Sequence, residues 1–256
     1  MFSLEEKVVI AIGAGLIGSE VVRGLAEAGA RVIIGDIDEK IGAELETKLK
    51  KKNLEVFYKK INMSNEESVD NFFKFIIERY NKIDALVNMA WPKTEDYNNK
   101  EKLYDYETFT QSLKKHLGGY YLTSIKVAEI MKNQNYGSII NFSSIYGITA
   151  PDFSIYEGTN MTNKISYASN KGAINILTKY IATRYGENNV RANIIAPGGV
   201  FNNQPSKFVN SYNKKTPLKR MANPNDIVGP VIFLISNAAS YITGHILLVD
   251  GGWSIW

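Results

Sequence analysis

Short apolar runs alternate along this chain with longer segments in which apolar residues recur every three or four positions. Seven of the runs have the length of strands that are buried on both faces. They span residues 7–12, 31–36, 54–58, 83–87, 137–142, 190–195 and 245–249. Strands that alternate with helices in this way predict an α/β fold built on a parallel sheet.

The segments between the runs predict helices. Ser64, followed three residues later by Glu67, has the spacing of a capping box at the start of a helix over 64–80. The other helices are expected at about 16–28, 38–52, 106–132, 167–185 and 224–236. Two segments, at about 151–166 and 201–213, show neither the helical nor the strand periodicity, and we expect them to be substrate loops. We find no linker or repeat, which predicts a single domain over residues 1–256.

Composition narrows the classes of function. The chain has 45% hydrophobic and 22% charged residues, which is typical of a globular protein with a substantial core. Its net charge of +4 comes from scattered lysines, so we expect no nucleic-acid partner. There is no cysteine and there are only two histidines, so we expect neither disulfides nor a metal site. No segment resembles a signal peptide or a membrane span, and we expect a cytoplasmic protein.

A glycine-rich turn follows the first strand. Gly13, Gly15 and Gly18 form a GxGxxG pattern between the strand and a helix. Glycines allow the backbone to approach a pyrophosphate, and the helix N-terminus attracts its charge. Asp36 ends the second strand, where a carboxylate accepts hydrogen bonds from the ribose of NAD and repels the 2′-phosphate of NADP. The alternative is that Asp36 is simply an acidic residue before a helix.

Candidate chemistry lies in the second half of the chain. Tyr167 and Lys171 are four residues apart, so a helix would place them on one face. A neighbouring ammonium favours the phenolate and would bring the pKa of the tyrosine toward neutrality, as a proton-transfer group requires. Ser143 and Ser144 follow the fifth strand, at the sheet edge where ligands bind. Such Tyr–Lys pairs are common on helix surfaces, and it is the order of the motifs that favours a catalytic role.

Together these motifs resemble those of the short-chain dehydrogenases/reductases, in their compact single-domain branch, over essentially the whole chain. The matching features are GAGLIG at 13–18, Asp36, NMA at 88–90, NFSS at 141–144, YASNK at 167–171, PGG at 197–199 and VDGGW at 249–253. The resemblance implies a Rossmann-type three-layer sandwich, with a seven-stranded parallel sheet and helices on both faces. It also implies a nicotinamide cofactor, which Asp36 indicates to be NAD rather than NADP, and the interconversion of a hydroxyl and a carbonyl.

The resemblance assigns roles by position. Tyr167 would be the general acid/base, Lys171 would lower its pKa and bind the nicotinamide ribose, and Ser144 would be the catalytic hydroxyl. Cofactor contacts would come from Gly13, Gly15, Leu16, Ile17, Gly18, Asp36, Ile37, Asn62, Met63, Asn88, Met89, Ala90, Tyr167, Lys171, Pro197, Gly198, Val200 and Asn202.

The chain departs from the family pattern at several of these positions. The glycine-rich turn is one residue shorter than usual. His116 stands where an Asn usually belongs to the proton relay; it would pass a proton there, or be a helix histidine without a role. Asn62 replaces an Asp that contacts adenine, Asn202 replaces a Thr that binds the carboxamide, and Trp91 replaces a Gly and would reshape the pocket.

Within the family, the segments PDFSIYEGT, FNNQPSKF and TPLKRMA resemble a subgroup of flagellin-modification oxidoreductases. This implies a sugar or sugar-nucleotide substrate in surface-glycan biosynthesis. Polar side chains of the 151–166 loop suit a polyhydroxyl ligand, unless they only cap the loop's own backbone. The residues expected to contact substrate are Trp91, Ser144, Phe153, Tyr156, Glu157 and Asn160.

Two other functions compete with this hypothesis. A dinucleotide-binding sensor or scaffold without turnover would explain the short turn and His116, but it does not need the Ser–Tyr–Lys set. A 3-oxoacyl-type reductase would use NADPH and an apolar lid, which Asp36 and the polar loop do not favour. The family's usual helix pairing implies a homotetramer or homodimer.

Overall fold

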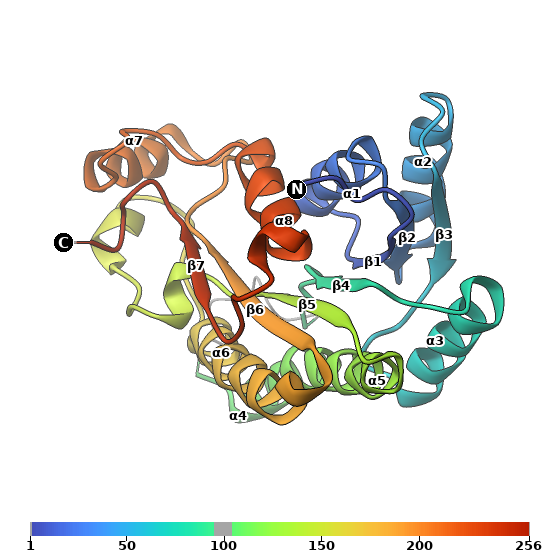
Figure 1. The fold of residues 1–256 in the computed structure, drawn as a ribbon. Helices are drawn as coiled ribbons and strands as arrows, with labels where there is room; N and C mark the ends of the chain where they lie inside the picture. Colours follow the sequence, from blue (N-terminus) through green and yellow to red (C-terminus); the bar gives the residue numbers. More distant parts are fainter. Residues whose placement is uncertain (1, 95–103, 256) are drawn as a thin grey trace.

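The structure, a computed structural model, describes residues 2–94 and 104–255. Its centre is a seven-stranded sheet in which every neighbouring pair of strands is parallel, in the order β3-β2-β1-β4-β5-β6-β7 (Figure 1). The strands are β1 (Val8–Ile12), β2 (Arg31–Asp36), β3 (Val56–Lys60), β4 (Ala85–Asn88), β5 (Gly137–Phe142), β6 (Val190–Pro197) and β7 (Ile246–Val249).

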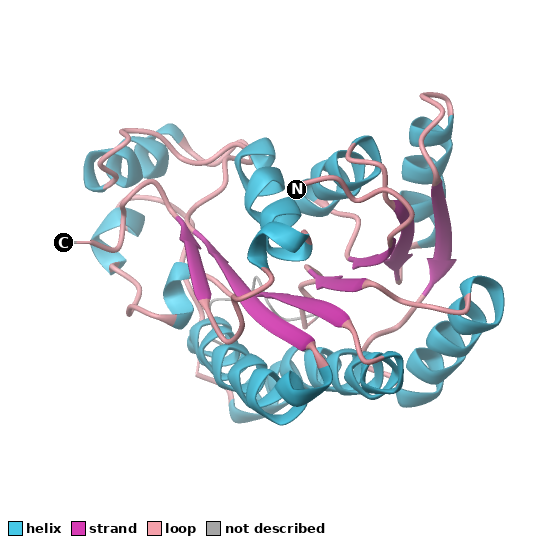
Figure 2. Cartoon of the chain, viewed as in Figure 1, coloured by secondary structure: helices cyan, strands magenta, loops and turns pink. Residues whose placement is uncertain are grey.

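Helices cover both faces of this sheet (Figure 2). One layer consists of α1 (Leu16–Glu27), α2 (Glu39–Lys50) and α8 (Val228–Ile235). The other consists of α3 (Glu66–Tyr80), α5 (Gly118–Gln134) and α6 (Ile165–Tyr185), with α4 (Tyr106–Ser112) leading into it. The predicted three-layer α/β fold with a seven-stranded parallel sheet is confirmed.

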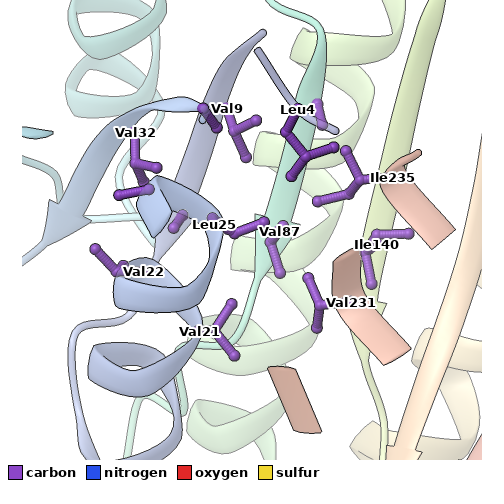
Figure 3. Close-up of a cluster of buried hydrophobic side chains, with 14 of the residues drawn as sticks. Leu4, Val9, Val21, Val22, Leu25, Val32, Val87, Ile140, Val231 and Ile235 are labelled. Atoms are coloured by element: carbon purple, nitrogen blue, oxygen red, sulfur yellow. The ribbon is translucent and has the colours of Figure 1, made fainter. Parts of the chain in front are cut away.

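Five strands, β1, β2, β4, β5 and β6, send alternate side chains into two separate cores. On β1, Val9 faces the α1–α8 layer and Ile10 faces the opposite layer, because successive side chains of a strand point to opposite faces. Each fully buried aliphatic side chain contributes about 1.5–3 kcal/mol relative to an exposed one. Figure 3 shows the first core, with Leu4, Val9, Val21, Val22, Leu25, Val32, Val87, Ile140, Val231 and Ile235 labelled.

The strand order determines where a ligand can bind. The chain moves outward from β1 through β2 to β3, then returns to the other side of β1 and continues from β4 to β7. The connections after β1 and β4 therefore diverge at the carboxyl ends of two neighbouring strands. In open parallel sheets this divergence creates a crevice for ligands.

Several predicted boundaries are wrong. Helix α3 is capped by Asn65, whose side chain accepts the backbone N–H of Ser68, whereas the Ser64 hydroxyl donates to the Lys115 carbonyl. Strand β3 begins two residues later than expected, at Val56. The helix expected over 106–132 contains a π-helical turn, Leu113–Leu117, between α4 and α5.

The two expected substrate loops also contain helical structure. The first includes a 3₁₀ turn, Phe153–Tyr156. Most of the second is helix α7 (Ser206–Lys215), which buries Phe208 and Tyr212, one turn apart. This spacing is a helical signal that the polar residues around it obscured.

Candidate active site

A cavity of about 930 Å³ lies along the carboxyl ends of the strands. That volume is near the upper end of the ~300–1,000 Å³ that ligand pockets usually have. Most of the predicted cofactor and substrate residues line it. They are Gly13, Gly15, Leu16, Ile17, Gly18, Asp36, Ile37, Asn62, Met63, Met89, Ala90, Trp91, Ser144, Tyr156, Asn160, Tyr167, Lys171, Pro197, Gly198, Val200 and Asn202.

The glycine-rich turn forms one end of the cavity. Gly13 has φ +104°, and a Cβ there would lie 2.6 Å from the Ala90 nitrogen. A Cβ on Gly18 would lie 1.7 Å from the Gly13 carbonyl oxygen, so both positions require glycine. Gly15 is the N-cap of α1, and no side chain caps that helix start. An uncapped helix N-terminus beside a cavity is the environment that a pyrophosphate requires, so the shortened turn fits a dinucleotide.

Asp36 lies where β2 ends and also supports this turn. Its carboxylate accepts the backbone N–H of Ala14 at 2.7 Å and that of Asp38 at 2.9 Å. The same side chain lines the cavity. Asp36 therefore stabilises the turn and also faces the cavity, so a structural role and a ligand contact are compatible at this residue.

Asn88 does not line the cavity. It is fully buried, and its side-chain amide donates to Ser124 at 3.1 Å and to Asn141 at 2.9 Å. The Tyr120 hydroxyl donates to the Asn88 backbone carbonyl at 3.0 Å. This network joins β4, β5 and α5, so Asn88 is a buried structural residue here and is not part of the cavity lining where a cofactor contact was expected.

The candidate catalytic groups meet at the other end of the cavity, between β5 and α6. The two serines after β5 differ in their contacts, because the Ser143 hydroxyl donates to the Lys171 carbonyl at 2.9 Å, whereas Ser144 interacts with the Tyr167 hydroxyl. The Lys171 ammonium donates to the Phe142 carbonyl at 2.7 Å and lies 5.8 Å from the centre of the Tyr167 ring. The fold thus brings Ser144, Tyr167 and Lys171 together at this end of the cavity, as the order of the motifs predicted.

The electrostatics of this group differ from the expectation. Burial raises the pKa of Tyr167, and the hydrogen bond from Ser144 opposes that shift only in part. Burial also lowers the pKa of Lys171 to about 7. Since the lysine itself is so poorly solvated, it loses part of its charge near neutral pH. The pKa of Tyr167 is therefore raised by its burial, whereas the Tyr–Lys spacing had led us to expect a lowered pKa.

His116 lies behind these groups, in the π-helical turn, and does not line the cavity. Its ring packs against Tyr120 with centroids 5.4 Å apart, and the Lys171 ammonium lies 5.4 Å from that same Tyr120 ring. Neither imidazole nitrogen has a hydrogen-bond partner among the described residues. Burial, helped by the nearby Lys171, lowers the pKa of His116 well below its usual range, so the imidazole is neutral. Single π-helical turns are frequent at functional sites.

The substrate end of the cavity is more polar and aromatic than predicted. Trp91 packs edge-on against Tyr167, with ring centroids 5.0 Å apart. The Tyr146 and Tyr156 hydroxyls are 3.0 Å apart. Phe153 and Glu157, by contrast, are exposed and do not line the cavity, because the 3₁₀ turn directs Ile155 inward instead.

Several residues that line this end of the cavity were not predicted from the sequence. They include Lys93, Tyr146, Met161, Thr162, Asn163, Lys164, Gln204, Phe208, Tyr212 and Met221. The four-residue spacing of Phe208 and Tyr212 in α7 could have indicated a helix that packs against the cavity, whereas no sequence pattern marked the loop residues. Among the described residues, no group of three His, Cys, Asp or Glu side chains could hold a metal ion, and no helix is long and apolar enough to cross a membrane.

A parallel sheet with this turn at one end of its cavity and a Ser–Tyr–Lys set at the other defines a class of nucleotide-dependent oxidoreductases. Residues 13–254 match the model of a family described as Enoyl-(Acyl carrier protein) reductase. With the relatives below, this match places the chain in the short-chain dehydrogenase/reductase family.

Its relatives within that family have several activities. The chain is 35% identical to the post-translational flagellin modification protein A of Campylobacter coli, over 98% of this chain and 100% of that protein. It is 30% identical to a 7alpha-hydroxysteroid dehydrogenase of Bacteroides fragilis, over 100% and 97% of the two chains. A gluconate 5-dehydrogenase of Burkholderia cenocepacia, solved with NADP and tartrate, superposes with a TM-score of 0.87 at 25% identity, covering 100% and 98% of the two chains.

Proposed function

We propose that this protein is an NAD-dependent oxidoreductase that interconverts a secondary hydroxyl and a ketone on a sugar or sugar nucleotide, in surface-glycan biosynthesis. One observation carries the proposal: Ser144, Tyr167 and Lys171 line one end of a cavity whose other end is an uncapped helix start. This arrangement suits a dinucleotide that reaches from the turn to the tyrosine.

A nicotinamide dinucleotide would supply or accept the hydride when it is bound between these two ends. In reduction, the Tyr167 hydroxyl donates its proton to the carbonyl oxygen of the substrate, and in oxidation it takes the proton back. The Ser144 hydroxyl holds that oxygen while its charge changes. Lys171 anchors the group through its bond to the Phe142 carbonyl, and with a pKa of about 7 it can exchange a proton near neutral pH.

The cofactor preference rests on Asp36. Its carboxylate lines the cavity at the end of β2, where it would accept hydrogen bonds from the adenosine ribose and repel a 2′-phosphate. The NADP-bound relative means that this preference must be tested for the present chain. In fluorescence titrations we expect NADH to bind more tightly than NADPH. Asp36→Asn keeps one acceptor, for the Ala14 N–H, and loses both the charge and the acceptor for the Asp38 N–H. It should narrow the difference in affinity between NADH and NADPH. Tighter NADPH binding by the parent protein would refute this role.

The sugar-like substrate is supported by the polar residues at the catalytic end, including Tyr146, Tyr156, Asn160 and Asn163. It is also supported by the flagellin-modification relative. The test is NADH consumption with a panel of keto-sugars, compared with a 3-oxoacyl thioester and an oxosteroid. Preferential turnover of a keto-sugar is expected, whereas preferential turnover of either of the others would refute this substrate class.

We also propose a homodimer or homotetramer. The outer faces of α5 and α6 carry exposed large apolar side chains, Tyr121 on α5 with Ile176 and Tyr180 on α6. Side chains of this kind on adjacent helices favour association with a second copy. Light scattering should give a multiple of 28.7 kDa, and a monomeric mass would refute the proposal.

A further inference from the structure

The charges around the cavity are unevenly distributed. Among its described lining residues the only carboxylate is Asp36, at the end of β2. The lining lysines are Lys93, Lys164 and Lys171, and the last of these belongs to the candidate catalytic group. The remaining two lysines have no role in the chemistry proposed above, and a cavity that is cationic at one end selects its ligand by charge.

Lys164 is the more unusual of the two. The residue is only 3% exposed, and lysine is rarely buried to this extent unless it is paired. It is the N-cap residue of α6, and its carbonyl accepts the Tyr167 N–H at 3.0 Å, so it lies less than one helical turn before the candidate proton donor. The positive end of the α6 dipole is at the same place.

Lys93 reaches this region from the segment that follows β4. Its ammonium lies 4.6 Å from the centre of the Trp91 ring, and that ring packs against Tyr167 at 5.0 Å. Thus two lysines from separate segments are placed near the candidate proton donor. An ammonium has three donor hydrogens, so each lysine can bind a ligand oxygen in addition to its neighbours in the protein.

Asn163 adds an acceptor beside Lys164. Its amide donates to the Tyr156 hydroxyl, and its buried Oδ1 has no hydrogen-bond partner among the described residues. A buried acceptor without a partner costs about 1–3 kcal/mol. A ligand hydroxyl or amide N–H would remove that cost, so this wall can bind a donor and an anionic group of one molecule.

We propose that the substrate carries an anionic oxygen group, a carboxylate or a phosphate, which binds Lys164 and Lys93 while a neighbouring hydroxyl or amide of the substrate donates to Asn163. This inference rests on the proposed sugar substrate and makes it more specific: the substrate is an acidic or phosphorylated sugar. A neutral sugar has no anionic oxygen to accept from these two lysines.

The test is calorimetric titration of the NADH-loaded protein with glucose, glucose 6-phosphate and glucuronate. These three probes distinguish no charge, phosphate and carboxylate on one sugar ring. We expect at least one anionic probe to bind ten times or more tightly than glucose. Lys164→Met should weaken that binding about 10- to 100-fold, as expected for the loss of a charge-assisted hydrogen bond. Lys207→Met, which removes an exposed lysine that does not line the cavity, is the matched control and should bind like the parent.

Equal binding of all three probes, binding of none, or an unaltered affinity in Lys164→Met would overturn the inference. So would weaker NADH binding by Lys164→Met with unchanged sugar binding, because Lys164 would then belong to the cofactor site. The proposed function fails separately, if the protein does not bind NADH or if no keto-sugar is reduced, since the titration does not depend on turnover.

Discussion

Lys171 makes the sharpest quantitative prediction of this structure. Its ammonium is buried, and burial lowers its pKa from the ordinary 10.5 to about 7. Between these two values the unfolded chain binds a proton at this lysine and the folded chain does not. Lys171 therefore makes the free energy of unfolding rise as the pH increases from about 7 to 10.5. The destabilisation caused by burying this lysine is complete only below about pH 7.

Lys171→Met removes this titration while keeping a side chain of similar length. Each pH unit within the window changes the free energy of unfolding by about 1.4 kcal/mol. From pH 7.5 to 9.5, the stability of the variant minus that of the parent should fall by about 2.5 kcal/mol, slightly less than two full units because the parent still titrates at pH 7.5.

The assay is urea unfolding of the cofactor-free parent and variant at several pH values, with Lys179→Met as the control. Lys179 is exposed on the same helix, so its stability difference from the parent should stay constant over this range. A constant difference for Lys171→Met would show that the lysine titrates normally, and it would refute the argument that burial depletes its charge.

Three further variants separate chemistry from structure. Ser144→Ala should lower kcat about 10²-fold or more, because the substrate oxygen loses its hydrogen-bond donor. Ser143→Ala should mainly reduce the free energy of unfolding, by about 1–3 kcal/mol, because its hydroxyl donates to a backbone carbonyl. Equal effects of the two variants on kcat would contradict this division of roles. His116→Leu should leave the unfolding free energy within about 1 kcal/mol of the parent or raise it, because neither ring nitrogen has a described partner, while it lowers kcat and displaces its pH profile. An unchanged pH profile would mean that His116 has no part in proton transfer.

The architecture was predictable because its signals are local. Buried runs such as 137–142 predict strands by length and composition, and β5 has the predicted bounds. The turn glycines and the Tyr167–Lys171 spacing also depend on neighbouring residues only. The structure explains Gly13 and Gly18 by contacts of under 3 Å that a side chain would make with nearby backbone.

What the sequence could not supply depends on burial and on contacts between distant segments. No local pattern shows that Tyr167 and Lys171 are both desolvated, so neither the raised pKa of the tyrosine nor the lowered pKa of the lysine was predicted. The inward position of Lys164 follows from how the 151–164 segment packs over the cavity, which periodicity does not encode. The π-helical turn at His116 could not be predicted either, because its residues continue the periodicity of an ordinary α-helix.

The central claim is that the Tyr167 hydroxyl moves the proton while a hydride passes between nicotinamide and substrate in this cavity. Its most direct test is the rate of NADH oxidation by Tyr167→Phe and by the parent with the best keto-sugar of the panel, with NADH affinity measured alongside. The account predicts a rate about 10²- to 10⁴-fold lower in the variant, with NADH binding within a few-fold of the parent. An unchanged rate would contradict it.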